Sequence, residues 1–217
     1  MNNSVGNTAR LLWAGLRALL LLTVVCGVLY PLAVTGIAQV AFHDKANGSE
    51  ITSGGRVVGS SLIGQTYLTK DGKPDLKWFQ PRPSNGLGEN SVNTQYKLIL
   101  SGATNLSGDN KDLIKQVEEA RAAVVEDNST TTYRVRPSDV PADAVTSSGS
   151  GLDPAISPRY ADLQIHRVAE RNHLSVAQVR KLVDDHTDGR ILGFMGEPGV
   201  NVLELNVALQ QLTAESG

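Results

Sequence analysis

The chain has 217 residues, a formal net charge of −2 and 41% hydrophobic residues. Because the charge is slightly negative and lysines and arginines form no run, the composition argues against a nucleic-acid partner. The sole cysteine, Cys26, has no second cysteine to pair with, so the chain folds without an intrachain disulfide.

An uncharged, apolar segment covers residues 18–42. As an α-helix rising about 1.5 Å per residue it would extend roughly 37 Å, more than the bilayer core of about 30 Å. A cleaved signal peptide is one alternative, since Arg10 and Arg17 precede the segment, but signal cores are only about 7 to 15 residues long. A buried helix of a globular domain is another, and apolar residues on every face argue against it. We therefore expect a transmembrane helix, kinked at Pro31.

The charges on either side of the apolar segment predict its orientation. Arg10 and Arg17 are the only charged residues before it, whereas acidic and basic residues balance just after it. The positive-inside rule therefore places the N-terminus in the cytoplasm. We expect a cytoplasmic tail at residues 1–17, a transmembrane helix at 18–42 and an extracytoplasmic domain at 43–217. An outer domain without disulfides fits a bacterial plasma membrane.

The residues beyond the apolar segment suffice for one domain with its own core. The clearest helix is expected between Asp109 and Glu126, where apolar residues recur at helical spacing. Asp109 can cap its N-terminus, and Asn128 follows its end. Capping signals mark three further helix starts, at Ser157 with Pro158, Ser175 with Gln178, and Asn201 with Glu204.

Extended segments are predicted where β-branched residues and glycines are frequent. Residues 51–69 indicate short strands broken by turns, and residues 130–135 and 191–195 also have strand composition. Residues 77–83 contain two prolines that forbid a helix. The expected fold class is therefore an α+β ectodomain on a single N-terminal transmembrane helix.

The glycine-rich pieces lack the G-x-x-x-x-G-K-[ST] arrangement that cradles nucleotide phosphates. The most unusual local sequence is the Ser/Gly loop, residues 146–154. It could form an anion nest or present Ser150 as a nucleophile, yet no glycine lies two positions before that serine, as a nucleophile elbow requires. The alternative, which we favour, is a tight connection that leads into the helix starting at Ser157.

Metal binding is not supported, because no histidine lies three or four residues from another. The two arginines Arg82 and Arg190 are flanked by proline or glycine, and such rigid neighbours favour a fixed pairing with a carboxylate. The four histidines are His43, His166, His173 and His186.

Six ordered motifs resemble those of one family, the C subunit of the Kdp-type potassium-transporting ATPase of bacteria. The resemblance extends from the apolar segment to Leu209. The motifs lie at residues 59–65, 78–84, 101–106, 145–158, 164–169, and from 187 through 203.

The resemblance implies a non-catalytic subunit of an ATP-driven, high-affinity potassium uptake complex. In such a complex a channel-like subunit binds potassium, and a P-type ATPase subunit holds ATP and Mg²⁺ and hydrolyses the nucleotide. A small single-span subunit and membrane lipid complete the expected partners. The C subunit is expected to stabilise assembly and to cover the outer side of the channel-like subunit. The chain agrees in lacking the Asp-Lys-Thr-Gly phosphorylation motif, and no cofactor of its own is expected.

Two other functions remain open at this point. The chain could assist ATP binding by the catalytic subunit, because residues 100–105 loosely resemble the signature loop of ABC transporters. It could also be an independent anchored ligand-binding protein or hydrolase, and only the Ser/Gly loop supports that function.

The expected partner contacts fall into two groups. Small residues allow helices to approach closely in lipid, so Gly27, Ala33 and Gly36 are candidates for a helix–helix contact. The candidates in the outer domain lie in the family-like motifs and are Gln65, Arg82, Ser150 and Asp153.

Overall fold

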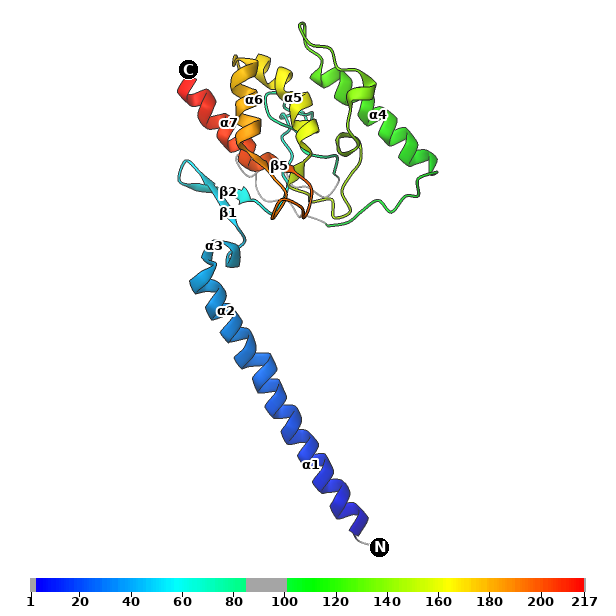
Figure 1. The fold of residues 1–217 in the computed structure, drawn as a ribbon. Coiled ribbons are helices and arrows are strands. Elements are labelled where there is room, and N and C mark those ends of the chain that lie inside the picture. The colour runs from blue at the N-terminus through cyan, green and yellow to red at the C-terminus, as the bar shows by residue number, and fades with distance from the viewer. Residues whose placement is uncertain (1–2, 85–100, 217) are drawn as a thin grey trace. The chain divides into compact units, whose positions relative to one another are not determined.

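The computed structural model describes residues 3–84 and 101–216 (Figure 1). It divides into two compact units, Met1–Ser49 and Glu50–Gly217, and each is described by itself. The first unit is helical, and the second mixes helices with small antiparallel sheets. The α+β class with a single long N-terminal helix is therefore confirmed, whereas the cytoplasmic and extracytoplasmic assignments stay predictions.

The first unit is a long helical segment followed by a short turn of helix. α1 (Asn3–Val24) continues through a π-helical stretch, η1 (Val25–Leu29), into α2 (Tyr30–Ala41), and α3 (His43–Ala46) follows. The segment Ser4–Ala41 is long and apolar enough to cross a membrane, and its most apolar window is 0% buried inside the chain. The helical segment Ser4–Ala41 is thus longer than the apolar segment, residues 18–42, from which a helix is predicted.

The π-helical stretch ends two positions before Pro31, where the sequence predicts a kink. A proline has no N–H, and its ring presses on the carbonyl four residues earlier, which here belongs to Gly27. Gly27 lies within η1, whose wider turn relieves this contact. The irregularity expected at Pro31 therefore takes the form of a π-bulge.

The second unit begins with a β-hairpin of β1 (Glu50–Ser53) and β2 (Arg56–Ser60). Gly54 and Gly55 connect the strands with φ of 56° and 75°, the positive values that a tight hairpin turn requires. Short strands broken by a glycine turn are thus confirmed in this region. Residues 77–83 are not helical, as their prolines predict.

α4 (Lys111–Asn128) is the predicted amphipathic helix, shifted by two residues. Its N-cap is Asn110 rather than Asp109, because the Asn110 Oδ1 accepts two backbone N–H groups of the first turn at 2.8 and 3.2 Å. Asp109 accepts a hydrogen bond from a serine hydroxyl instead. Asn128 was expected beyond the helix but is its last residue, and its buried side chain donates to the Val124 carbonyl and accepts a hydrogen bond from Arg167.

The rest of the second unit combines three helices with a three-stranded antiparallel sheet of order β3-β5-β4. Figure 1 shows α5, α6 and α7 close together, and α6 packs against both of the others. The N-caps predicted at Ser157, Ser175 and Asn201 are confirmed, because each side-chain oxygen accepts a backbone N–H of the following helix. The elements are η2 (Pro137–Asp139), η3 (Ala142–Ala144), β3 (Ala155–Ile156), α5 (Pro158–Arg171), α6 (Val176–Asp185), β4 (Thr187–Asp188), β5 (Gly199–Asn201) and α7 (Val202–Ser216).

Two predicted strands are wrong. Residues 130–135 have strand composition but form a tight turn, in which the Thr130 N–H donates to the Tyr133 carbonyl at 2.7 Å. Residues 191–195 form the end of a hairpin with only an isolated bridge, because Leu192 has a φ of 54°. In both places local hydrogen bonds and backbone geometry override the strand propensity of the side chains.

The core of the second unit encloses one irregular segment as well as the helices. On α5, Ala161, Ile165 and Val168 are each 0% exposed, so the predicted apolar face is confirmed. Phe79, from the irregular segment before α4, is also 0% exposed. Because this segment lacks helix or strand, its buried backbone groups need hydrogen-bond partners from side chains.

Two buried amides supply those partners. The Asn206 side chain of α7 accepts the Phe79 N–H and donates to the Phe79 carbonyl, both at 2.9 Å. The Gln164 side chain of α5 does the same for Gln80, at 2.7 and 3.1 Å. Each amide thus forms with one residue of the segment the two backbone hydrogen bonds that a neighbouring β-strand would form.

Arg167 of α5 completes this arrangement. It is 2% exposed, and its guanidinium donates to the carbonyls of Leu76 and Trp78 and to the Asn128 side chain. Desolvation by burial lowers the pKa of Arg167 to about 10, so the side chain remains charged at neutral pH. Its charge is balanced mainly by carbonyl and amide oxygens rather than by a carboxylate in direct contact.

We predict that Asn206→Ala destabilises the full-length chain by about 2 to 5 kcal/mol, because it leaves two buried backbone groups of Phe79 unpaired. Asn172→Ala is the matched control, since Asn172 donates to the Lys77 carbonyl at the exposed edge of the same segment. Water can replace that bond, and the expected loss is below about 1 kcal/mol. Urea unfolding in detergent, followed by Trp78 fluorescence in a Trp13→Phe background, measures both. Equal losses would contradict the prediction.

Candidate functional site

Several family-like motifs converge on the Ser/Gly loop. From residues 59–65, the Gly64 N–H donates to the Leu152 carbonyl at 2.9 Å. From residues 101–106, the Gly102 N–H donates to the Ser150 carbonyl at 2.8 Å. Motifs far apart in the sequence therefore meet at one loop.

Residues 78–84 reach the loop through two side chains. Arg82 donates to Asp153 Oδ2 at 3.0 Å and lies 3.4 Å from the carbonyl oxygens of Thr146 and Ser147. Ser84 donates its hydroxyl to the Gly151 carbonyl. The pairing predicted for Arg82 is confirmed, and one guanidinium holds both ends of the loop together.

The tightest point of the loop is Gly151. Its φ is 69°, and a Cβ added there would lie 2.9 Å from the Gly102 carbonyl oxygen. Only glycine satisfies both conditions without strain. The loop therefore has the tight geometry that the sequence favours over a nucleophile elbow.

Ser150 shows no catalytic partners among the described residues. Its hydroxyl accepts the Leu152 N–H at 3.1 Å and lies 3.3 Å from the Ser148 hydroxyl. Neither a histidine nor a carboxylate hydrogen-bonds to it in this part of the chain. A serine without a base to accept its proton is not activated for attack.

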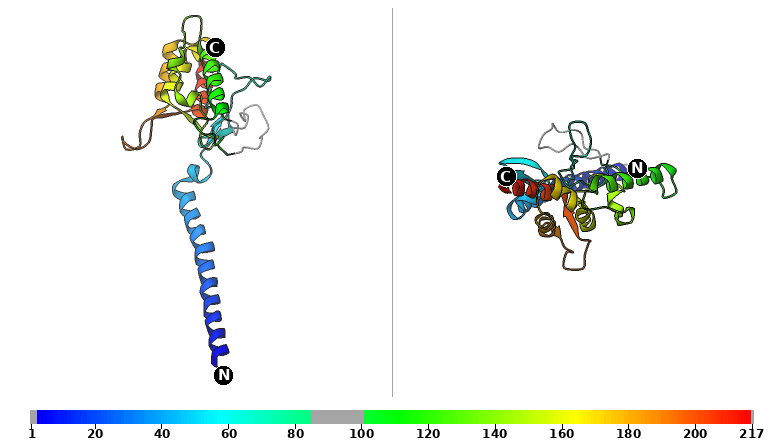
Figure 2. Two further views of the ribbon diagram at one scale, coloured as in Figure 1. Left: turned by 90° about the vertical axis from the view of Figure 1, so that its right-hand side faces the viewer. Right: turned by 90° about the horizontal axis from the view of Figure 1, so that it is seen from above.

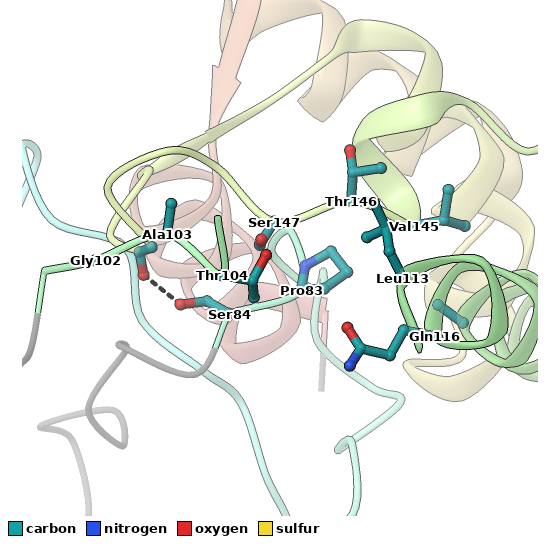
Figure 3. Close-up of a pocket in the computed structure, with 12 residues that line it drawn as sticks. Pro83, Ser84, Gly102, Ala103, Thr104, Leu113, Gln116, Val145, Thr146 and Ser147 are labelled. Atoms are coloured by element: carbon teal, nitrogen blue, oxygen red, sulfur yellow. Dashed lines mark hydrogen bonds between the residues drawn. The ribbon is translucent and has the colours of Figure 1, made fainter. Parts of the chain in front are cut away.

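A cavity of about 480 Å³ adjoins the loop (Figure 3). Leu113 and Gln116 of α4 lie on one side of it, and Ser84 and Gly102 lie on the other. Its described lining contains hydroxyl, amide and apolar groups but no charged side chain. Such a lining suits packing of a polypeptide or a neutral group better than acid–base chemistry or binding of phosphate.

The other expected contact residues are more scattered. Gln65 donates from Nε2 to the Val58 carbonyl at 2.8 Å, and its Oε1 is buried without a partner among the described residues. Gly27 and Gly36 lie on the N-terminal helix, where a Cβ added at Gly36 would meet nothing within 4 Å. Ala33 lies in α2 between them, and like them it is exposed in the isolated chain.

Arg190 also pairs as predicted, with Glu197 at 3.0 Å. Within the described ranges 3–84 and 101–216, no group of three histidine, cysteine or acidic side chains is arranged to hold a metal ion.

The sequence did not reveal three side chains that position the family-like motifs: the amides of Gln164 and Asn206, and the hydroxyl of Ser84. Ser84 is the last residue of the family-like motif at residues 78–84, and its place in that motif could have identified it as a structural residue. Gln164 and Arg167 also lay in such a motif, but their spacing gave no sign of what they bind. Asn206 gave no signal, because its partner Phe79 lies 127 positions away.

We predict that Gly151→Ala destabilises the chain by about 2 kcal/mol or more, because the left-handed backbone alone costs an alanine about 1 to 2 kcal/mol and the new methyl presses on Gly102. Gly149→Ala is the matched control, since a Cβ there meets nothing within 4 Å. It should change stability by less than about 0.5 kcal/mol. Thermal unfolding in detergent compares the two, and equal shifts would contradict this account of the loop.

The chain matches the model of the family "K+-transporting ATPase, c chain" over residues 12–211. It is 74% identical to the potassium-transporting ATPase KdpC subunit of Streptomyces avermitilis, with all of both chains covered. It is 65% identical to that of Streptomyces coelicolor, over 99% of this chain and 98% of the relative. Identity to that of Mycobacterium tuberculosis is 45%, over 94% and 99% of the two chains. The chain therefore belongs to the KdpC family and is a subunit of a potassium-transporting ATPase.

Proposed function

We propose that this chain is a non-catalytic subunit that stabilises the assembled potassium pump and covers the outer side of its channel-like subunit. The observation that carries the proposal is the exposed apolar surface of the helical segment Ser4–Ala41 in the isolated chain. Such a surface is stable only when lipid or other helices cover it. One helix cannot enclose a polar path, so a role in potassium transport requires partner helices.

The small residues of the N-terminal helix are the proposed contact with the channel-like subunit. An added Cβ at Gly36 meets nothing within 4 Å, and one at Gly27 meets only its own helix at 4.0 Å. Backbones approach closely at such positions, and van der Waals packing then stabilises helix pairs in lipid. Ala33, three positions before Gly36, is a further small residue of this helix.

The second unit is proposed to lie outside the plasma membrane, with the N-terminus in the cytoplasm. Arg10 and Arg17 support this orientation by the positive-inside rule. ATP and Mg²⁺ then belong to the P-type catalytic subunit on the other side. The small single-span subunit and lipid are the remaining proposed neighbours.

The Ser/Gly loop is proposed to contribute shape rather than chemistry. Arg82 and Asp153 are engaged with each other, so they set the geometry of the loop that a partner meets. Ser150 remains exposed at its surface and is the better candidate for a direct contact, together with the half-buried Gln65.

A direct role in ATP binding has less support. A signature loop must present its serine and glycine to nucleotide, whereas Ser101 and Gly102 both donate to the Ser150 carbonyl.

In a Cys26→Ser background, a Ser101→Cys variant should react with an impermeant thiol reagent added outside intact cells. Reaction only from the cytoplasmic side would reverse the proposed orientation.

We predict that the tagged chain, purified in mild detergent from native membranes that express the pump, carries a channel-like subunit and a P-type ATPase subunit in fixed ratio. Gly27→Leu/Gly36→Leu should lower their recovery by about fivefold or more, because leucines hold the helices apart. Gly6→Leu, outside the apolar segment, is the control and should leave recovery unchanged. Recovery of the wild-type chain alone would overturn the proposal.

A further inference from the structure

An exposed apolar hairpin end, residues 190–196, joins β4 to β5; we call it the apolar arm. Its four large side chains are Ile191, Leu192, Phe194 and Met195, which are 67%, 80%, 71% and 48% exposed. In Figure 2 this orange-brown segment extends away from the helices of its unit in both views. Single exposed apolar residues are ordinary on protein surfaces, but four large ones between positions 191 and 195 are typical of an interaction site.

An ion pair and backbone hydrogen bonds define the shape of the arm. At its base, Arg190 and Glu197 form an ion pair at 3.0 Å. Above the pair, Ile191 and Met195 exchange backbone hydrogen bonds at 2.9 and 3.0 Å. On both sides of the arm the chain continues into the β4-β5 pairing of the three-stranded sheet. A preorganised arm loses little conformational freedom when a partner covers it.

The backbone conformation and exposure of Leu192 also support a binding surface. Its φ of 54° lies in the left-handed region, which disfavours a leucine, and its side chain is 80% exposed. Asparagine fits this backbone better and would also be better solvated. Neither folding nor solubility of the isolated chain explains a leucine here, whereas an apolar binding partner does.

The charges beside the arm indicate what covers it. Asp184 and Asp188 are exposed carboxylates without an ion pair among the described residues, and Asp185 is paired with Lys181. The one arginine of the arm is already occupied by Glu197. Such an acidic surrounding is repelled by anionic lipid headgroups, whereas it complements a basic rim on a protein.

We propose that the apolar arm inserts into an apolar pocket, rimmed by basic side chains, on a polytopic subunit of the same complex. This inference rests on the proposed assembly function and names the surface that performs it. The exposed aromatic and aliphatic side chains fill the pocket, and the carboxylates at the base face its rim.

Photocrosslinking tests the contact directly. The photoreactive residue p-benzoylphenylalanine replaces Phe194 in the full chain, which is irradiated in native membranes that express the pump. We expect an adduct with a polytopic subunit of the complex, identified by mass. The same residue at Ile114, an exposed position on α4, is the control and should give no such adduct. Adducts with lipid only, with a second copy of this chain only, or no adduct would overturn the proposal.

A double variant tests whether the contact contributes to assembly. Leu192→Asn/Phe194→Ser should lower co-purification of the partner subunits by about tenfold, because the apolar anchors are lost. Asn at position 192 suits the backbone, so the thermal unfolding midpoint should not fall. Ile114→Gln is the matched control and should retain wild-type recovery. If the wild-type chain recovers partners and the double variant recovers them equally, the arm is not the contact; if the wild type recovers none, the assembly function itself fails.

Discussion

The second unit depends on a few buried polar side chains that hold an irregular segment in its core. Asn206 and Gln164 each pair with both backbone groups of one residue, Phe79 and Gln80, and Arg167 binds the carbonyls just before them. These bonds replace the ladder that a strand would provide, so Phe79 can be buried without orphaned backbone groups. Without them, burial of this segment would cost several kcal/mol.

The same bonds determine what the surface presents. Once Phe79 and Gln80 are fixed, Arg82 and Ser84 follow at short range and meet the Ser/Gly loop, which Gly151 closes tightly. The loop and the cavity beside it are therefore positioned by the same core. Surfaces without an activated nucleophile among the described residues suit a subunit that binds other proteins, and the apolar helix of the first unit needs lipid or partner helices to cover it.

The sequence was most informative where the determining interaction is local. The caps at Ser157, Ser175 and Asn201, the glycine turn at residues 54–55 and the apolar helix each depend on neighbours within a few positions. The strands expected at residues 130–135 and 191–195 did not form, although their composition favours strands. Residues 130–135 form a tight turn, and Leu192 has a backbone φ in the left-handed region. The amide partners of the irregular segment lie 84 and 127 positions away, and no local pattern encodes such contacts. The composition of the Ser/Gly loop made it stand out in the sequence, but only the structure showed that the family-like motifs meet there.

The central claim is that the chain stabilises the pump without performing its chemistry. The most direct measurement is potassium-stimulated ATP hydrolysis by the purified partner subunits in liposomes, with and without this chain. We expect the partners alone to show at least about tenfold less of that activity than the complete complex, and to regain it when the purified chain is added. Full potassium-stimulated hydrolysis by partners that lack the chain would contradict the account.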